Sequence, residues 1–138
     1  MSAQENKVLA RYYLERIFNH KSLAVIDEFY SPDVMDHSPL TGFALGLEGY
    51  RSQITLFLAT FPDLVVEYQD FTCEADRVFS RYTLTATHQG EFAGIAATGK
   101  RVRVSGMDML RFKEGKVVEH WSELDLFGLM QQLGASPA

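Results

Sequence analysis

The sequence contains a single cysteine, Cys73, among 138 residues, so no disulfide can form within the chain. This is typical of a protein in a reducing compartment. The N-terminus lacks a basic segment followed by an apolar stretch, which a secretory signal would have. The longest apolar run, residues 54–61, is far too short to span a bilayer. We therefore expect a cytoplasmic protein with no membrane partner.

Signatures of several other protein classes are also missing. The chain has a net charge of −5 and no block of basic residues, which argues against nucleic acid as the main partner. It has no phosphate-binding loop, no G-x-S-x-G nucleophile elbow and no dinucleotide fingerprint. Because 46% of the residues are hydrophobic, the chain can form a sizeable core, and we expect one domain over residues 1–138.

The period of the apolar residues changes along the chain. Helical spacing dominates the first part, and two-residue alternation dominates the second. The predicted helices cover about 4–19, 22–31, 48–60 and 126–133, and the predicted strands cover 64–73, 77–88, 101–112 and 116–124. Helices followed by antiparallel strands predict an α+β fold.

The most informative segment is the predicted hairpin around the Glu114-Gly115 turn, because ionisable groups lie in rows that should be apolar. Strand side chains alternate between faces. On the first strand, the inward row consists of Val102, Val104, Gly106, Asp108, Leu110 and Phe112. On the return strand, the matching row consists of Val118, His120, Ser122 and Leu124. A carboxylate and an imidazole that face a core or cavity must be paired with each other or another group, held in their neutral forms, or used in binding or catalysis. A pocket with acid/base chemistry is the leading hypothesis.

Asp108 could act as a general base, since apolar neighbours would desolvate its carboxylate. His120 could orient Asp108 or donate a proton to a developing enolate oxygen. The alternatives are a buried aspartate paired for structural reasons and a core histidine bonded to a carbonyl. Trp121 should point to the opposite face, unless a bulge shifts the strand register.

Two further histidines are candidates for catalysis. His88 follows the inward parity of its strand and would look inward from the strand end, and His37 could close the mouth of the pocket or pair with Asp36. Three histidines could in principle bind a metal, but no pair has i, i+2 or HExxH spacing, so we expect no metal site. Asp125 and Asp63 are better explained as a helix cap and a turn residue.

Several motifs together resemble a known family. They are Tyr12-Tyr13, the segment 31–37 (SPDVMDH), 61–64 (FPDL), 87–92 (THQGEF), 110–116 (LRFKEGK), 119–121 (EHW) and 131–134 (QQLG). In these features the chain resembles the SnoaL-like polyketide cyclases, also called ester cyclases, of the nuclear-transport-factor-2-like superfamily. The resemblance covers nearly the whole chain.

This resemblance implies a cone-shaped barrel in which a strongly bent antiparallel sheet wraps around N-terminal helices and leaves a pocket. It also implies a homodimer formed through the outer face of the sheet, and an intramolecular aldol condensation without any cofactor. Counted from the Glu114-Gly115 turn, the catalytic aspartate of the family falls at Ser122 and its histidine partner at Asp108. Either the acid/base pair has been rearranged onto Asp108 and His120, or the activity is absent.

We therefore expect a cofactor-independent enzyme that abstracts the proton α to a carbonyl in a small, mostly apolar compound. Cyclisation, isomerisation and dehydration share this step. The residues expected to bind the substrate are Tyr12, Tyr13, Phe57, Phe92 and Ser122. A non-catalytic binding or carrier module is the second hypothesis, and a purely structural dimerisation domain without a cavity is the third.

Overall fold

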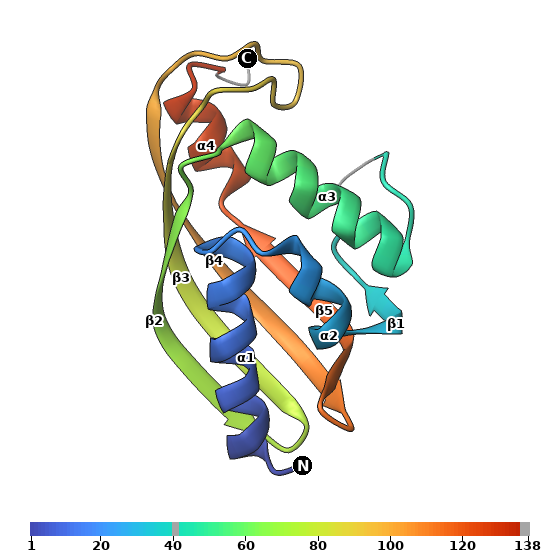
Figure 1. Ribbon diagram of the computed structural model, residues 1–138. Coiled ribbons are helices and arrows are strands. Elements are labelled where there is room, and N and C mark those ends of the chain that lie inside the picture. Colours follow the sequence, from blue (N-terminus) through green and yellow to red (C-terminus); the bar gives the residue numbers. More distant parts are fainter. Residues whose placement is uncertain (40–41, 136–138) are drawn as a thin grey trace.

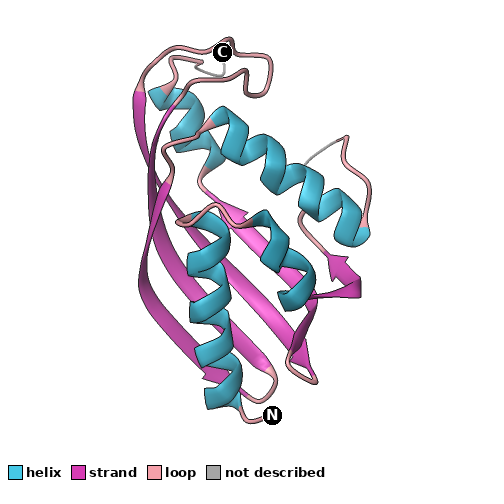
Figure 2. Ribbon diagram, viewed as in Figure 1, coloured by secondary structure: helices cyan, strands magenta, loops and turns pink. Residues whose placement is uncertain are grey.

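The structure, a computed structural model, describes residues 1–39 and 42–135. One sheet of five strands in the order β1-β5-β4-β3-β2 lies behind helices that cover one of its faces (Figures 1 and 2). The helices are α1 (Ala3–Phe18), a 3-10 turn η1 (Leu23–Val25), α2 (Ile26–Phe29), α3 (Gly46–Thr60) and α4 (Leu126–Gln132). The strands are β1 (Tyr30–Asp36), β2 (Val65–Glu74), β3 (Arg77–Thr87), β4 (Arg101–Lys113) and β5 (Lys116–Leu124). The predicted α+β cone is confirmed, with a sheet that curls but does not close into a barrel.

Helix α1 is defined at both ends by side-chain hydrogen bonds. Ser2 and Glu5 form a reciprocal capping box at its start. At its end, the Asn19 side chain accepts from the Val66 N–H at 2.7 Å and donates to the Val66 carbonyl at 2.9 Å. This pair of bonds fixes the end of α1 against β2, so that the apolar face of the helix packs onto the sheet.

Strand β1 is the main departure from the sequence-based prediction. We expected a helix up to Pro32 and then an extended entry into a loop, but the strand already begins at Tyr30 and pairs in parallel with β5. Proline is tolerated here because β1 is an edge strand, where a missing N–H breaks no ladder between two neighbours. The sheet is therefore not purely antiparallel, and Asp36 lies directly beside His120.

A bulge in β5 corrects part of the predicted inward row. Arg111 pairs with Glu119, but Phe112 pairs with Val117, so Val118 is the extra residue. Val117 is therefore buried in the core in place of Val118, whereas His120 keeps its predicted inward direction. The bulge lies before His120 and does not reverse the rest of the row.

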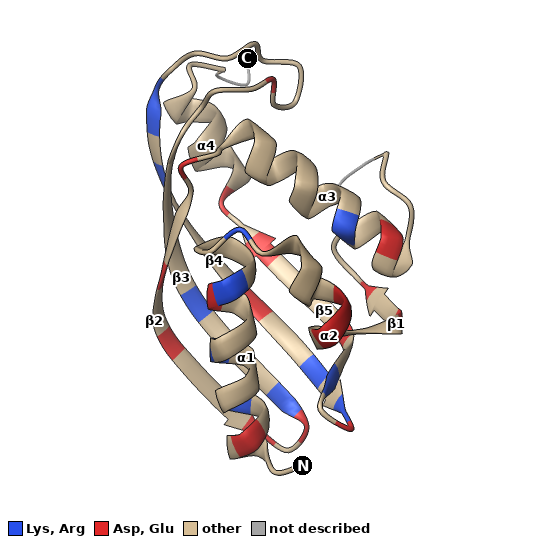
Figure 3. Cartoon of the chain, viewed as in Figure 1, with Lys and Arg blue, Asp and Glu red and all other residues tan. Residues whose placement is uncertain are grey.

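Helix α3 forms one wall over the sheet. Its two charged residues, Glu48 and Arg51, both lie in the first half, and no charge occurs from residue 52 to residue 60 (Figure 3). Helix α4 follows β5 and is capped by Asp125, which accepts from the Gly128 N–H at 2.9 Å, as expected. None of the helices in the described part of the chain is long and apolar enough to cross a membrane.

The bulge makes Val117 and Val118 a matched pair for mutation. Val117→Ala should reduce the free energy of unfolding by about 2 kcal/mol, because a fully buried side chain loses two methyl groups and leaves a void. Val118→Ala should change it by less than ~0.5 kcal/mol. Urea denaturation measures both values, and a larger loss for Val118→Ala would contradict the bulged register.

Candidate active site

A cavity of about 430 Å³ lies between α3, the end of β1 and the inner face of the sheet. Most of its walls are aromatic or aliphatic. The apolar and aromatic lining residues are Phe18, Pro39, Tyr50, Ile54, Phe57, Leu64, Val66, Tyr68, Tyr82, Leu84, Phe92, Leu124 and Leu126. The polar ones are Asp36, His37, Ser38, Gln53, Asp108, His120, Ser122 and Glu123. Such a mainly apolar pocket with a few convergent polar groups is typical of a small-molecule site.

The parallel pairing of β1 with β5 joins a carboxylate to His120. Asp36 and His120 are register partners, and His120 Nδ1 lies 3.3 Å from Asp36 Oδ1. The same carboxylate oxygen accepts from the backbone N–H of Ser38 at 3.0 Å. Both side chains are buried, so their charges depend on each other rather than on water.

Asp108 reaches the other nitrogen of the same imidazole from β4. Asp108 Oδ2 lies 3.9 Å from His120 Nε2, which is close enough for an ion pair and too long for a hydrogen bond. Asp108 Oδ1 is buried and has no hydrogen-bond partner among the described residues. Only 11% of the side chain is exposed, although it lines the cavity. The carboxylate therefore faces the cavity with free acceptor capacity.

The two carboxylates determine the charge of His120. Burial alone would favour the neutral ring, but Asp108 and Asp36 outweigh it and raise the pKa of His120 to about 9. Burial likewise opposes ionisation of Asp36, but hydrogen bonds from His120 and the Ser38 N–H leave the pKa of Asp36 below its ordinary value. At neutral pH the ring is therefore an imidazolium between two carboxylates.

Buried tyrosines surround this charged group. The Tyr30 and Tyr50 hydroxyls are 2.8 Å apart, and the ring of Tyr50 meets His120 edge-on with centroids 5.3 Å apart. Burial raises the pKa of both phenols well above the ordinary value, so both stay neutral. These tyrosines thus shield His120 from water without adding charge.

The predicted site residues separate into two groups. Asp108, His120, His37, Phe57, Phe92 and Ser122 line the cavity. His37 lies near the surface, where its ring stacks on Trp121 with centroids 4.5 Å apart and Nε2 is 3.3 Å from Glu119 Oε2.

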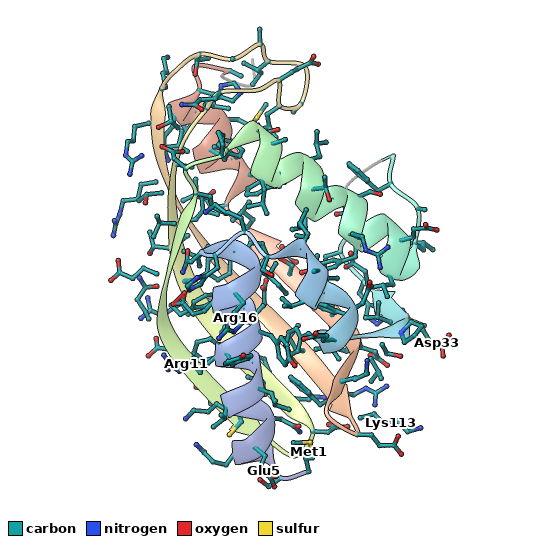
Figure 4. All side chains as sticks on the ribbon, viewed as in Figure 1. Met1, Glu5, Arg11, Arg16, Asp33 and Lys113 are labelled. Atoms are coloured by element: carbon teal, nitrogen blue, oxygen red, sulfur yellow. The ribbon has the colours of Figure 1, made fainter. Side chains whose placement is uncertain are left out.

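His88, Tyr12 and Tyr13 do not line this cavity. His88 points inward as expected but is fully buried, and its Nδ1 accepts from the Thr98 N–H at 3.1 Å, which holds the 89–99 loop. Tyr12 is half exposed on α1 under the guanidinium of Arg16, which Figure 4 labels. Tyr13 stacks on Phe29 in the core. Helical periodicity placed these tyrosines on α1 but could not show which part of the sheet each would face.

Sequence reasoning missed Asp36, Tyr50 and Tyr82 as cavity residues. Asp36 shares inward parity with Val34, and this signal was available once residues 30–36 were read as a strand. Tyr82 has the same strand parity as His88, which the sequence predicted to point inward, so its direction could have been found in the same way. The described residues contain no group of three or more His, Cys, Asp or Glu side chains arranged to hold a metal ion.

Comparison with known proteins agrees with this architecture. A family model described as SnoaL-like polyketide cyclase matches residues 7–133. The chain belongs to the SnoaL-like polyketide cyclase family. Among curated relatives of this SnoaL-like protein, the aklanonic acid methyl ester cyclase DnrD of Streptomyces peucetius is 25% identical over 111 residues, covering 78% of this chain and 72% of DnrD.

Solved structures extend the likeness of this SnoaL-like protein to nearly its whole length. TsrD from Streptomyces laurentii superposes with a TM-score of 0.87 at 29% identity, covering 98% of both chains. AclR from Streptomyces galilaeus, for which hydroxylase activity has been proposed, gives 0.86 at 36% identity, covering 99% of this chain and 89% of AclR. The fold therefore accompanies more than one assigned chemistry, and activity has to be argued from the site.

The buried imidazolium makes the stability of this SnoaL-like protein depend on pH. The folded pKa of His120, about 9, lies above its ordinary value of 6.5, so the stabilisation is complete below pH 6.5 and disappears as the pH rises through 9. The free energy of unfolding should fall by on the order of 2–3 kcal/mol across this window. His120→Gln should be less stable at pH 6 and should show a flatter profile. Denaturation in urea from pH 6 to pH 10 measures both, and an equally steep fall in the variant would refute this assignment.

Proposed function

We propose that this SnoaL-like protein is a cofactor-independent enzyme that removes a proton α to a carbonyl group in a small, mostly apolar molecule. Asp108 is the base and His120 is the donor to the resulting enolate oxygen. The observation that carries this proposal is Asp108 Oδ1, which has no hydrogen-bond partner among the described residues and is buried beside a mainly apolar cavity of about 430 Å³. A buried carboxylate oxygen that no protein donor satisfies is available to a ligand.

The proposed step conserves atoms and charge. The α-carbon gives its proton to an Asp108 oxygen, and the C–H electron pair moves into the C–C bond while the carbonyl oxygen becomes an enolate. The His120 imidazolium stabilises that oxygen by a charge-assisted hydrogen bond from Nε2. Asp36 holds the Nδ1–H of the same ring, so that the Nε2–H is directed into the site. Aldol cyclisation, isomerisation and dehydration can all proceed from this enolate.

The charges around the cavity favour a substrate without a free carboxylate. Asp36, Asp108 and Glu123 line it, and no lysine or arginine does so in the described part of the chain. A carboxylate-bearing substrate would be desolvated beside like charges, which costs several kcal/mol. A neutral carbonyl compound, such as a ketone or an ester, suits this lining.

A binding or carrier module is the alternative function. The observation that favours it is Ser122, which occupies the position at which the resemblance places the catalytic aspartate of the family. Serine cannot act as a base without a partner that takes its proton. In that case Asp108 would bind ligand, and no turnover would follow.

Proton exchange separates the two functions. The protein would be incubated in heavy water with a panel of aryl ketones and aryl β-keto esters, and deuterium uptake would be read by mass spectrometry. We expect wild type to accelerate exchange, and Asp108→Asn to lower the rate by a factor of about 100 or more while changing ligand affinity little. The matched control is Asp70→Asn, since Asp70 is an exposed carboxylate bound to Arg81.

Each outcome is informative. Exchange that depends on Asp108 and not on Asp70 supports a carboxylate base. Equal exchange with wild type and Asp108→Asn across the panel refutes the enzyme proposal. Ligand binding without accelerated exchange would instead favour the binding module.

We also propose that two copies associate through the outer face of the sheet. Phe79, Met109 and Trp121 are register partners on this face, and the neighbouring Met107 is 58% exposed. A contiguous apolar patch that is self-complementary about a two-fold axis is what a homodimer interface requires. The Arg81–Asp70 ion pair borders the patch and supplies the polar rim that such interfaces carry.

A charge in the middle of this patch should prevent association. Phe79→Glu should convert the dimer to a monomer at micromolar concentration, because a buried unpaired carboxylate costs several kcal/mol in each half of the interface. Val8→Glu is the control, since Val8 is an exposed apolar residue on α1 and lies outside the sheet. Light scattering after size-exclusion chromatography measures the mass. A monomeric wild type, or a dimeric Phe79→Glu, would contradict the proposal.

A further inference from the structure

The side chain of Tyr82 lies across strand β4 at a residue without a side chain. Tyr82 and Gly106 are register partners on β3 and β4. A Cβ atom at residue 106 would clash with the Tyr82 hydroxyl oxygen and would lie only 2.5 Å from the Tyr82 Cζ atom. Gly106 is not among the glycines with positive φ. The space taken by the phenol, rather than backbone conformation, is therefore what requires glycine here.

The position of the Tyr82 ring over Gly106 places the phenol on one side of Asp108. Gly106 and Asp108 are consecutive inward positions of β4, and Ser122 is the β5 partner of Asp108. His120 is the partner of Leu110, which is the next inward position in the opposite direction. Inward neighbours on one strand are separated by about 7 Å, and facing residues by about 5 Å. In the direction of the β4 axis, the His120 imidazolium on β5 therefore lies on one side of Asp108, and the Tyr82 hydroxyl from β3 lies on the other side.

The phenol is suited to donate a hydrogen bond. Burial and the nearby Asp108 carboxylate raise the pKa of Tyr82 far above its ordinary value, so the hydroxyl keeps its proton at neutral pH. The Ser122 side chain acts on this phenol in the opposite direction and lowers its pKa. Tyr82 also lines the cavity. Its O–H can therefore donate to a ligand in the cavity.

We propose that Tyr82, whose ring lies over Gly106, is a ligand-binding residue that donates to a second oxygen of the substrate. This inference rests on the proposed function, because it takes Asp108 as the point where the acidic carbon lies. An oxygen on one side of that carbon meets His120, and an oxygen on the other side meets Tyr82. Ligands with oxygens on both sides of the acidic carbon are then preferred over ligands with only one.

Two probes that cannot enolise test the preference without any turnover. The first is 2,2-dimethyl-1,3-diphenylpropane-1,3-dione, and the second is 2,2-dimethyl-1,3-diphenylpropan-1-one, in which a methylene replaces the second carbonyl. Binding of each would be measured by titration calorimetry at pH 6. Wild type should bind the diketone about tenfold more tightly, since one net hydrogen bond of typical strength corresponds to roughly a five- to tenfold change in affinity.

The variants assign this preference to Tyr82. Tyr82→Phe should bring the affinity ratio to about one while leaving monoketone affinity within roughly twofold. Gly106→Ala should also bring the affinity ratio to about one, because its Cβ atom would displace the Tyr82 ring. Ser105→Ala is the control, because Ser105 is the adjacent exposed residue on the outer face of β4. Circular dichroism and thermal unfolding would show that each variant is folded.

Three results would overturn the inference. They are an unchanged affinity ratio in Tyr82→Phe, equal affinity of wild type for the two probes, and no binding of either probe at millimolar concentration. The proposed enzyme function fails separately, through deuterium exchange that does not depend on Asp108. A Tyr82-dependent ratio without accelerated exchange would leave Tyr82 as a binding residue of a carrier.

Discussion

The structure depends on one buried imidazolium held between two carboxylates. Removing three ionisable groups from water is costly, and the cost is tolerable only because Asp36 and Asp108 meet opposite nitrogens of the His120 ring. Loss of either carboxylate would leave one nitrogen of the His120 ring without its partner in a mostly apolar cavity. The surrounding tyrosines, although polar, add no charge here, and the Tyr30 and Tyr50 hydroxyls bond to each other.

That requirement accounts for the most unexpected feature of the sheet. The three groups come from three adjacent strands, β1, β5 and β4, and they can meet only if β1 pairs with β5 in the register that sets Asp36 against His120. A parallel edge strand is an uncommon addition to an antiparallel sheet, yet here it supplies the counter-ion of the ring. The bulge at Val118 completes the arrangement, since it lets Val117 fill the core without turning His120 outward.

The sequence was sufficient for the fold class and for two of the three charged groups of the site. Alternation along residues 101–124 identified Asp108 and His120, because a carboxylate and an imidazole stand out in apolar rows. Asp36 was missed because its strand contains Pro32 and lies some 80 residues from its partner, and a parallel pairing over that distance leaves no local pattern. Tyr12 and Tyr13 were predicted to line the pocket but do not, for a related reason. Helical spacing shows that one face of a helix is buried, but it does not show which part of the sheet that face contacts.

The family resemblance places a catalytic aspartate at position 122, where this chain has serine. Positions 108 and 122 face each other across β4 and β5, so the Asp108 carboxylate lies within about 5 Å of the place that the resemblance gives to that aspartate. The histidine that the family resemblance places at 108 has its counterpart here at 120, on the other side of Asp108 from Gly106. The cationic donor then lies on one side of the carboxylate, and the opposite side is left to neutral hydroxyls. A phenol seated on a glycine fills that side without adding another charge to a site that already holds three.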